Sequence, residues 1–276
     1  MTRETLMKIK EIHVKDYLTK SNLPASDYVI NPYVGCLHAC KYCYACFMKR
    51  FTGHDENWGE FIDVKLCDKK IDINKLKGKS LFIASVTDCY NPIEKDYKIT
   101  RNILSQLINA DCEITITTKS ALVTRDIDII KQLKNVVVAI SINTLDERFK
   151  NDMDNANSIE ERIQTLRILH ESGIKTILFM SPIFPEITNF EDIILKTKDF
   201  VDEYWFENLN LRGNYKFTIL NYIKKNYPQL KELYNEIYLE NKMIYWQKLS
   251  DKIDEFCKKN NVNFKNYFYH DEIKKA

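Results

Sequence analysis

The chain has 276 residues, 45% of them hydrophobic, and its 41 Lys and Arg residues nearly balance 39 Asp and Glu residues. This length fits one large α/β domain or two small ones, and a net charge of +2 argues against nucleic-acid binding over the whole surface, while leaving room for a local basic groove. The amino-terminal segment lacks the apolar run of a signal peptide, and no stretch approaches the ~18 apolar residues of a membrane span, so we expect a cytoplasmic protein without a membrane segment.

Short apolar or β-branched segments alternate with amphipathic segments along the chain. The predicted strands are, in order, Tyr28–Val34, Leu81–Val86, Glu113–Thr118, Val136–Ile142, Ile174–Met180 and Tyr204–Leu209. Helical spacing of apolar residues predicts helices over Tyr97–Ala110, Ala121–Lys134, Ile159–Ser172 and Phe190–Val201. This alternation indicates βαβ units around a parallel sheet. The fold class is therefore α/β, and the number of units predicts a partial barrel, since a complete eight-fold barrel usually needs roughly 250 residues.

The last part of the chain has a different pattern. Ile219–Asn260 shows helical spacing and no convincing strand. We therefore predict two regions: residues 1–215 form the partial barrel with an N-terminal extension, and residues 216–276 form a helical C-terminal extension packed on the barrel. In parallel α/β folds the chemistry gathers at the carboxyl ends of the strands, so the residues that follow each predicted strand are the candidates for function.

Cysteines provide the strongest chemical signal. The chain has eight, and Cys36, Cys40, Cys43 and Cys46 fall within eleven residues, too close together for a well-spread disulfide framework. Cys36, Cys40 and Cys43 form a CxxxCxxC loop after a strand that ends near Gly35. Thiolates bind iron well, and short spacings let one loop wrap an iron–sulfur cubane. Three ligands for four irons would leave one iron open to a substrate or cofactor.

Two other interpretations of this loop stay open. A structural zinc site needs four ligands, and His38 or Cys46 could supply the fourth, although no second CxxC pair follows. The chain would then be a non-catalytic zinc or iron–sulfur binding module. Alternatively, the cysteines are buried free thiols, which this spacing disfavours. We interpret Cys46 as a packed thiol, because it follows Cys43 by about one helical turn.

The surrounding residues resemble a known family. The string from Asn31 to Ala45, NPYVGCLHACKYCYA, is similar to the radical S-adenosylmethionine (SAM) superfamily, and within it to the spore photoproduct lyase-like branch. Further matches are Thr87-Asp88, Pro92, Glu94, Thr100-Arg101, Thr118-Lys119-Ser120, Arg125-Asp126 and Ser181-Pro182. The segments Phe47–Arg50, Gly53-His54 and Trp58–Phe61 resemble the subgroup called radical SAM mobile pair proteins.

This resemblance implies a partial (β/α)6 TIM-like barrel and a 4Fe-4S cluster on Cys36, Cys40 and Cys43. The open iron would bind S-adenosylmethionine, and reductive cleavage would give a 5′-deoxyadenosyl radical that abstracts hydrogen from an unidentified substrate. That substrate would be a nucleoside or nucleic acid, or a small molecule or peptide. The implied partners are a reducing electron donor such as flavodoxin or ferredoxin and, for the subgroup, a paired partner protein.

The resemblance also assigns SAM contacts to the residues at successive strand ends. Tyr42 would lie near the adenine, and Lys119 would pair with the SAM carboxylate. The other implied contacts are Thr87, Asp88, Ser141, Asn143 and Ser181. Each has a plainer alternative, because Ser and Thr are frequent turn and cap residues at strand ends, Asp88 could cap a turn, and Lys119 could be a solvated surface lysine.

The sequence departs from the lyase at one position. The lyase has a hydrogen-donating cysteine immediately before the residue that matches Thr87, and here that place is taken by Val86, which argues against a DNA-repair lyase of the spore photoproduct type. Cys89 follows shortly after and is our candidate for facing the same cavity as a hydrogen donor. Tyr44, the second candidate catalytic residue, would relay a radical or pack beneath the cluster.

Overall fold

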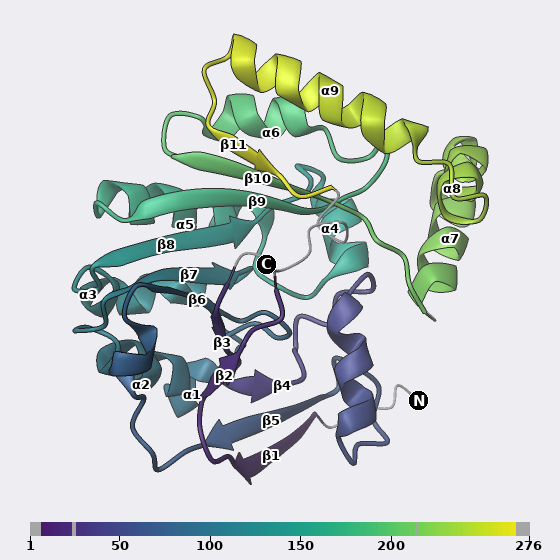
Figure 1. Cartoon of the computed structure of the whole chain (residues 1–276). Helices are drawn as coiled ribbons and strands as arrows, with labels where there is room; N and C mark the ends of the chain where they lie inside the picture. The colour runs from purple at the N-terminus through teal and green to yellow at the C-terminus, as the bar shows by residue number, and fades with distance from the viewer. Residues whose placement is uncertain (1–6, 24–25, 214, 269–276) are drawn as a thin grey trace.

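The computed structural model describes residues 7–23, 26–213 and 215–268. Its centre is an eight-stranded sheet in the order β11-β10-β9-β8-β7-β6-β3-β2, which fans into an open barrel (Figure 1). The strands are β2 (Leu18–Lys20), β3 (Tyr28–Ile30), β6 (Lys79–Ile83), β7 (Cys112–Thr118), β8 (Asn135–Ser141), β9 (Lys175–Ile183), β10 (Glu203–Asn208) and β11 (Phe264–Asn266). All neighbouring pairs from β3 to β11 are parallel, while β2 runs antiparallel to β3. The predicted partial barrel is confirmed.

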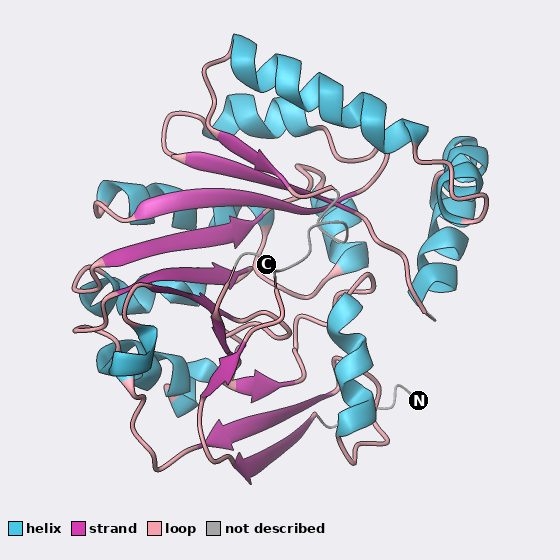
Figure 2. Cartoon of the chain, viewed as in Figure 1, coloured by secondary structure: helices cyan, strands magenta, loops and turns pink. Residues whose placement is uncertain are grey.

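Helices cover the outer side of this sheet and connect its strands (Figure 2). They are α1 (Glu94–Tyr97), α2 (Ile99–Gln106), α3 (Ile127–Ile130), α4 (Glu147–Met153), α5 (Ile159–Glu171) and α6 (Phe190–Thr197), with short 3-10 helices η2 (Ile73–Leu76) and η3 (Ala121–Asp126). The sequence explains where α5 begins, because Ser158 and Glu161 form a capping box that satisfies free N–H groups at its start. Apolar side chains of the strands, such as Ile116, Val138 and Leu178, pack beneath these helices and are fully buried.

A second, three-stranded sheet lies beside the barrel in the order β1-β5-β4 (Figure 1). Its strands are β1 (Lys8–His13), β4 (Tyr33–Val34) and β5 (Phe61–Leu66). The single strand predicted over Tyr28–Val34 is therefore wrong: β3 and β4 belong to different sheets. The reason lies at Asn31-Pro32, where the Asn31 side chain accepts from Val86 N–H at 3.0 Å and the Pro32 carbonyl accepts from Lys65 N–H at 3.1 Å.

A buried charge network links β4 of the small sheet to α1, α2 and η3, which cover the barrel. Tyr33 of β4 donates its hydroxyl to Glu94, whose carboxylate also pairs with Arg125 at 2.7 Å. Arg125 in turn pairs with Asp126 at 2.7 Å, and Asp126 also accepts from Arg101 at 2.8 Å. Because Glu94 and Asp126 are fully buried, these contacts compensate charges that would otherwise be costly inside the protein.

The carboxyl-terminal region contains α7 (Tyr215–Asn226), η4 (Pro228–Leu230), α8 (Lys231–Tyr238) and α9 (Ile244–Lys259). These helices lie within the segment predicted as a helical extension, and the chain then returns to the sheet as β11, parallel to β10, which the sequence did not indicate. Residues 269–276 of the predicted extension lie outside the described residues, and the boundary at 215/216 stays a prediction.

None of the helices in the described ranges combines the length and apolar character needed to cross a bilayer.

Candidate functional site

The cysteine loop, Cys36–Cys43, follows β4 at the end of the barrel where the parallel strands terminate. It begins at Gly35, whose φ of +92° and close approach to β5 require glycine, because a Cβ there would lie 2.4 Å from the Phe61 carbonyl oxygen. Two turns shape the loop: Ala39 N–H donates to the Cys36 carbonyl at 3.2 Å, and Cys43 N–H donates to the Cys40 carbonyl at 3.1 Å. The helix η1 (Tyr44–Phe51) follows at once.

Segments distant in sequence hold this loop in place. Lys41 N–H donates to the Met153 carbonyl at 2.9 Å, and Asn155 N–H donates to the His38 carbonyl at 2.8 Å. On the other side, the Asn91 side chain accepts from Leu37 N–H at 2.8 Å. These hydrogen bonds satisfy backbone groups that regular secondary structure would otherwise pair, so the protein's own contacts define the shape of the loop.

The three thiols of the loop influence one another electrostatically. Burial raises the pKa of Cys36, and the nearby Asp88, Cys40 and Cys43 raise it further. Burial also raises the pKa of Cys40, to about 12, against the opposing effect of Lys119. Soft sulfur donors that must lose protons to bind suit an iron–sulfur cluster. Within the described ranges, no three His, Cys, Asp or Glu side chains converge on a position for a single metal ion.

A covering segment, residues 52–60, packs on the cysteine loop. Gly59 has φ +100°, and its Cα is so close to Ala39 that a Cβ would lie 2.5 Å from the Ala39 Cβ. His54 anchors the segment, with its ring nitrogens 2.8 Å from Asp63 and 3.0 Å from Glu56. The His54 ring also stacks on Phe61 at 4.0 Å. The segment is thereby fixed to β5 on one side and to the cysteine loop on the other.

Asp88 lies in the loop after β6 and is engaged by the protein itself. One carboxylate oxygen accepts from Tyr90 N–H at 2.8 Å and from the Thr118 hydroxyl at 2.7 Å, and the other accepts from Lys119 N–H at 2.8 Å. His38 Nε2 lies 3.1 Å from that second oxygen. Burial raises the pKa of Asp88, but these neighbours outweigh it and bring the pKa to about 2. The carboxylate therefore ties β6 and β7 to the cysteine loop.

Thr87 is occupied in a similar way. Its hydroxyl donates to the Gly35 carbonyl at 2.6 Å and accepts from the Asn91 side chain at 3.4 Å. The structure therefore places Thr87 and Asp88 beside the cysteine loop, with their side chains directed at protein groups, and their contact with SAM stays a prediction. This geometry favours a role in positioning the loop.

Lys119 differs from these two residues. Its Nζ lies 5.8 Å from the centre of the Tyr42 ring, and its charge lowers the pKa of Cys40. Within the described part of the chain, no carboxylate lies at ion-pair distance from this ammonium group. Tyr42 is buried, and its hydroxyl donates to Asp154 at 3.2 Å, which also pairs with Arg162 at 2.6 Å. Lys119 thus presents a positive charge beside the thiols.

The remaining predicted SAM contacts follow β8 and β9. Ser141 and Asn143 are buried at the end of β8, and Asn143 donates its side-chain amide to the Pro182 carbonyl at 3.0 Å. Ser181 donates its hydroxyl to Glu207 near the end of β10. These residues therefore lie on consecutive strands of the same sheet edge.

Tyr44 and Cys89, the predicted catalytic residues, have opposite environments. Tyr44 is 52% exposed as a whole residue, but its hydroxyl end is covered and donates to the Ser85 carbonyl, so burial raises the pKa of Tyr44, with a smaller effect of Glu207 in the same direction. Cys89 is 0% exposed and lies in the hydrophobic core, with its Sγ 3.8 Å from the Thr117 carbonyl. The prediction that Cys89 faces the cavity of the site is therefore wrong, because its side chain turns into the core.

A comparison with models of protein families identifies the family of this chain. The model of the Radical SAM superfamily matches residues 30–196, most of the barrel and the whole cysteine loop. The chain belongs to the radical SAM superfamily. Members of this superfamily are enzymes that use an iron–sulfur cluster and SAM. Two similar chains extend the match: Uncharacterized protein MJ0683 of Methanocaldococcus jannaschii is 39% identical over 92% of this chain and 95% of its own length. Uncharacterized protein ORF301 of Acidianus two-tailed virus is 32% identical over 60% of this chain and 59% of its own length.

Solved radical SAM structures have a similar fold. Spore photoproduct lyase complexed with dinucleoside spore photoproduct superposes with a TM-score of 0.59 at 16% identity, over 82% of this chain and 68% of the lyase. SuiB of Streptococcus suis, bound to S-adenosylmethionine, gives a TM-score of 0.56 at 16% identity, over 86% of this chain and 49% of SuiB. At this identity the likeness concerns the fold.

Several residues of the site carry no sequence signal of their own. Asn91, Asp154 and Arg162 hold Tyr42 and the cysteine loop, yet none belongs to a motif with recognisable spacing. Trp58 could be noticed as one of three tryptophans. The structure places it next to Cys43, whose pKa is raised chiefly by burial.

Proposed function

We propose that this radical SAM protein is an enzyme that binds a 4Fe-4S cluster through Cys36, Cys40 and Cys43 and abstracts hydrogen from a substrate. The observation that carries the proposal is the grouping of three mutually interacting thiols with the ammonium of Lys119, which has no ion-pair partner among the described residues. When bound, the cluster supplies the electron that cleaves SAM to methionine and a 5′-deoxyadenosyl radical. The protein's task is to orient SAM and to exclude water.

The side chains divide this task by position. Lys119 would hold the SAM carboxylate by a charge-assisted hydrogen bond. Tyr42, Ser141, Asn143 and Ser181 would contact the rest of the cofactor. Thr87 and Asp88 keep the cysteine loop in register through the contacts described above, and Tyr44, exposed and close to Glu207, remains the candidate for contact with the reacting substrate.

The substrate belongs to one of two classes. The lyase neighbour carries a dinucleoside photoproduct and the SuiB family of structures includes a complex with a precursor peptide, which supports a nucleoside or nucleic acid, or a peptide or small molecule. Val86 and the buried Cys89 leave this chain without an accessible thiol in the lyase position, which disfavours the repair reaction. A reducing electron donor such as flavodoxin or ferredoxin would complete the system, in a reducing cytoplasmic setting that suits eight free cysteines.

Anaerobic reconstitution tests this proposal. We expect about four irons and four sulfides per chain, an electron paramagnetic resonance signal that SAM perturbs, and 5′-deoxyadenosine after reduction. Stoichiometric zinc without sulfide would instead support a non-catalytic zinc-binding module and would contradict the proposal that the protein is an enzyme.

Cys40→Ala provides the matched variant for this experiment. We expect it to abolish both the cluster and SAM cleavage, because two thiolates hold a cubane poorly. Cys112→Ala, which removes a buried thiol on β7 far from the loop, is the control and should retain both. Normal turnover by the Cys40 variant would refute the ligand assignment.

A further inference from the structure

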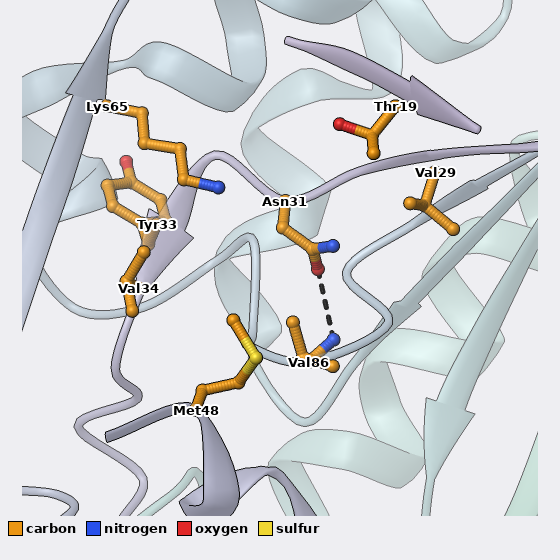
Figure 3. A pocket seen from close by; sticks show the side chains of 8 residues that line it. All are labelled: Thr19, Val29, Asn31, Tyr33, Val34, Met48, Lys65 and Val86. Carbon is orange, nitrogen blue, oxygen red and sulfur yellow. Dashed lines mark hydrogen bonds between the residues drawn. The ribbon is translucent and has the colours of Figure 1, made fainter. Parts of the chain in front are cut away.

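A cavity of about 180 Å³ lies where the two sheets meet (Figure 3). One wall comes from β3, through Val29, and the opposite wall comes from β4 and β5, through Val34 and Lys65. Met48 of η1 and Val86, from the loop after β6, complete the apolar lining. The cavity therefore adjoins β4, which precedes the cysteine loop, and η1, which follows it. None of the residues predicted above to contact SAM lines the cavity.

Lys65 is the charged group of this cavity. Its main chain is fixed, since its N–H donates to the Pro32 carbonyl at 3.1 Å and its carbonyl accepts from the Tyr17 hydroxyl at 2.9 Å. Its ammonium group points into the cavity between Tyr33 and Asn31 (Figure 3). Within the described ranges, this ammonium group has no ion-pair partner, and burial lowers its pKa against a weaker opposing effect of Asp63.

Three polar groups near Lys65, those of Asp63, Asn31 and Tyr33, are already engaged. Asp63, the carboxylate nearest to Lys65 along β5, lies 2.8 Å from His54. Asn31 accepts from Val86 N–H at 3.0 Å and donates to the Ser85 hydroxyl at 3.0 Å. Tyr33 directs its hydroxyl to Glu94. By contrast, the surface lysine Lys69 pairs with Asp16 at 2.6 Å. An amine that is half-buried without a counter-ion is costly, and an anion in the cavity would compensate it.

We propose that this cavity binds an anionic group, a carboxylate or a phosphate, on a small apolar body, with Lys65 as its cationic partner. The valines and Met48 would contact the apolar body. The volume corresponds to roughly six water molecules at ~30 Å³ each, enough for a ring or short chain with one head group. Because the cavity adjoins the cysteine loop, we take this ligand to be part of the substrate, an identification that rests on the proposed function.

Calorimetric titration of the reconstituted protein tests the cavity with three probes that share one ring: benzoate, phenyl phosphate and the neutral benzyl alcohol. We expect at least one of the two anions to bind at least about tenfold more tightly than the alcohol, and their ranking distinguishes carboxylate from phosphate. Lys65→Met should lose that preference, and Lys65→Arg should retain it. Lys20→Met is the matched control, because Lys20 is exposed on β2 and does not line the cavity.

A second measurement keeps the proposal testable if Lys65→Met does not fold. Acetylation of Lys65 in the unmodified protein, followed by mass spectrometry, should slow when the bound anion is present and stay unchanged with benzyl alcohol. Equal affinity for all three probes, or equal acetylation rates with and without the anions, would overturn the proposal. Neither measurement uses SAM or a reductant. Loss of anion binding with normal 5′-deoxyadenosine formation would therefore reject the cavity alone, and the reverse result would reject the proposed function alone.

Discussion

Asp88 and Lys119 are neighbours at the ends of β6 and β7, joined by a hydrogen bond of 2.8 Å between the Asp88 carboxylate and the Lys119 main chain. Their side chains nevertheless differ. Asp88 is surrounded by donors from the protein, whereas the Lys119 ammonium group faces Tyr42 and the thiols. Sequence position identified both residues, because both follow parallel strands. It could not show which side chain the protein itself satisfies, since that depends on contacts such as Thr118 and Tyr90.

Lys119→Met should weaken SAM binding while leaving the iron content unchanged. Loss of a charge-assisted hydrogen bond costs about 1.5–3 kcal/mol, which corresponds to roughly ten- to a hundredfold in affinity. Equilibrium dialysis with labelled SAM on the reconstituted protein measures this. Lys134→Met, at an exposed position just before β8, is the control. Unchanged SAM affinity in the Lys119 variant would show that another group holds the carboxylate.

Cys89→Ala should leave the cluster, SAM cleavage and the products unchanged, because the thiol lies in the core and away from solvent. Its effect should be on stability, a loss of about 1 kcal/mol for the small cavity that remains. Urea unfolding and product analysis by mass spectrometry check the two parts. Altered products would mean that Cys89 reaches the substrate after all.

At the scale of elements, continuous apolar runs were reliable signals. Val136–Ile140 is such a run, typical of a buried parallel strand, and it lies in β8. Two elements escaped prediction for physical reasons. The division between β3 and β4 depends on what Asn31 and Pro32 contact across the chain, and β11 is three residues long, too short for any periodic pattern. The covering segment likewise has no regular structure, so only its contacts define it.

Gly59→Ala should displace the covering segment from the cysteine loop. The added Cβ meets Ala39 at 2.5 Å, and the φ of +100° disfavours any side chain, so we expect a loss of more than about 2 kcal/mol in stability together with reduced iron content. Gly78→Ala is a matched control: its φ is also positive, at +63°, but the space around it is open. Thermal unfolding and iron analysis measure both effects. Equal losses in the two variants would show that backbone strain alone is responsible.

At the scale of the whole molecule, the last described strand, β11, adds to the edge of the sheet beside β10 after a series of helices. Glu203 of β10 joins three strands there, pairing with Lys175 of β9 at 3.3 Å and Lys265 of β11 at 3.0 Å and accepting from Trp205 Nε1 at 2.8 Å. Burial raises the pKa of Glu203, but these partners prevail and hold it below its usual value of 4.5. The carboxyl-terminal region is thereby coupled to the barrel.

This coupling should depend on pH. Because the pKa of Glu203 is lower in the folded state than in the unfolded chain, its contribution is complete above pH 4.5 and is lost as the pH falls through the folded-state pKa. The free energy of unfolding of the natural chain should exceed that of Glu203→Gln by about 1 kcal/mol near pH 7, and the difference should shrink below pH 4.5. Urea titrations at several pH values measure it. A difference that does not vary with pH would contradict the assignment.

The contacts between the cysteine loop and later parts of the chain also determine when the loop can form during protein synthesis. All three thiols leave the ribosome early, yet the carbonyls and N–H groups that shape their loop belong to Met153 and Asn155, and Arg162 fixes the Asp154 that holds Tyr42. A nascent chain that ends before Met153 therefore lacks these partners of the loop, and one that ends before α5 still lacks Arg162. Cluster insertion by assembly factors should accordingly follow the emergence of α5, and until then the thiols are exposed to oxidation and to the wrong metals.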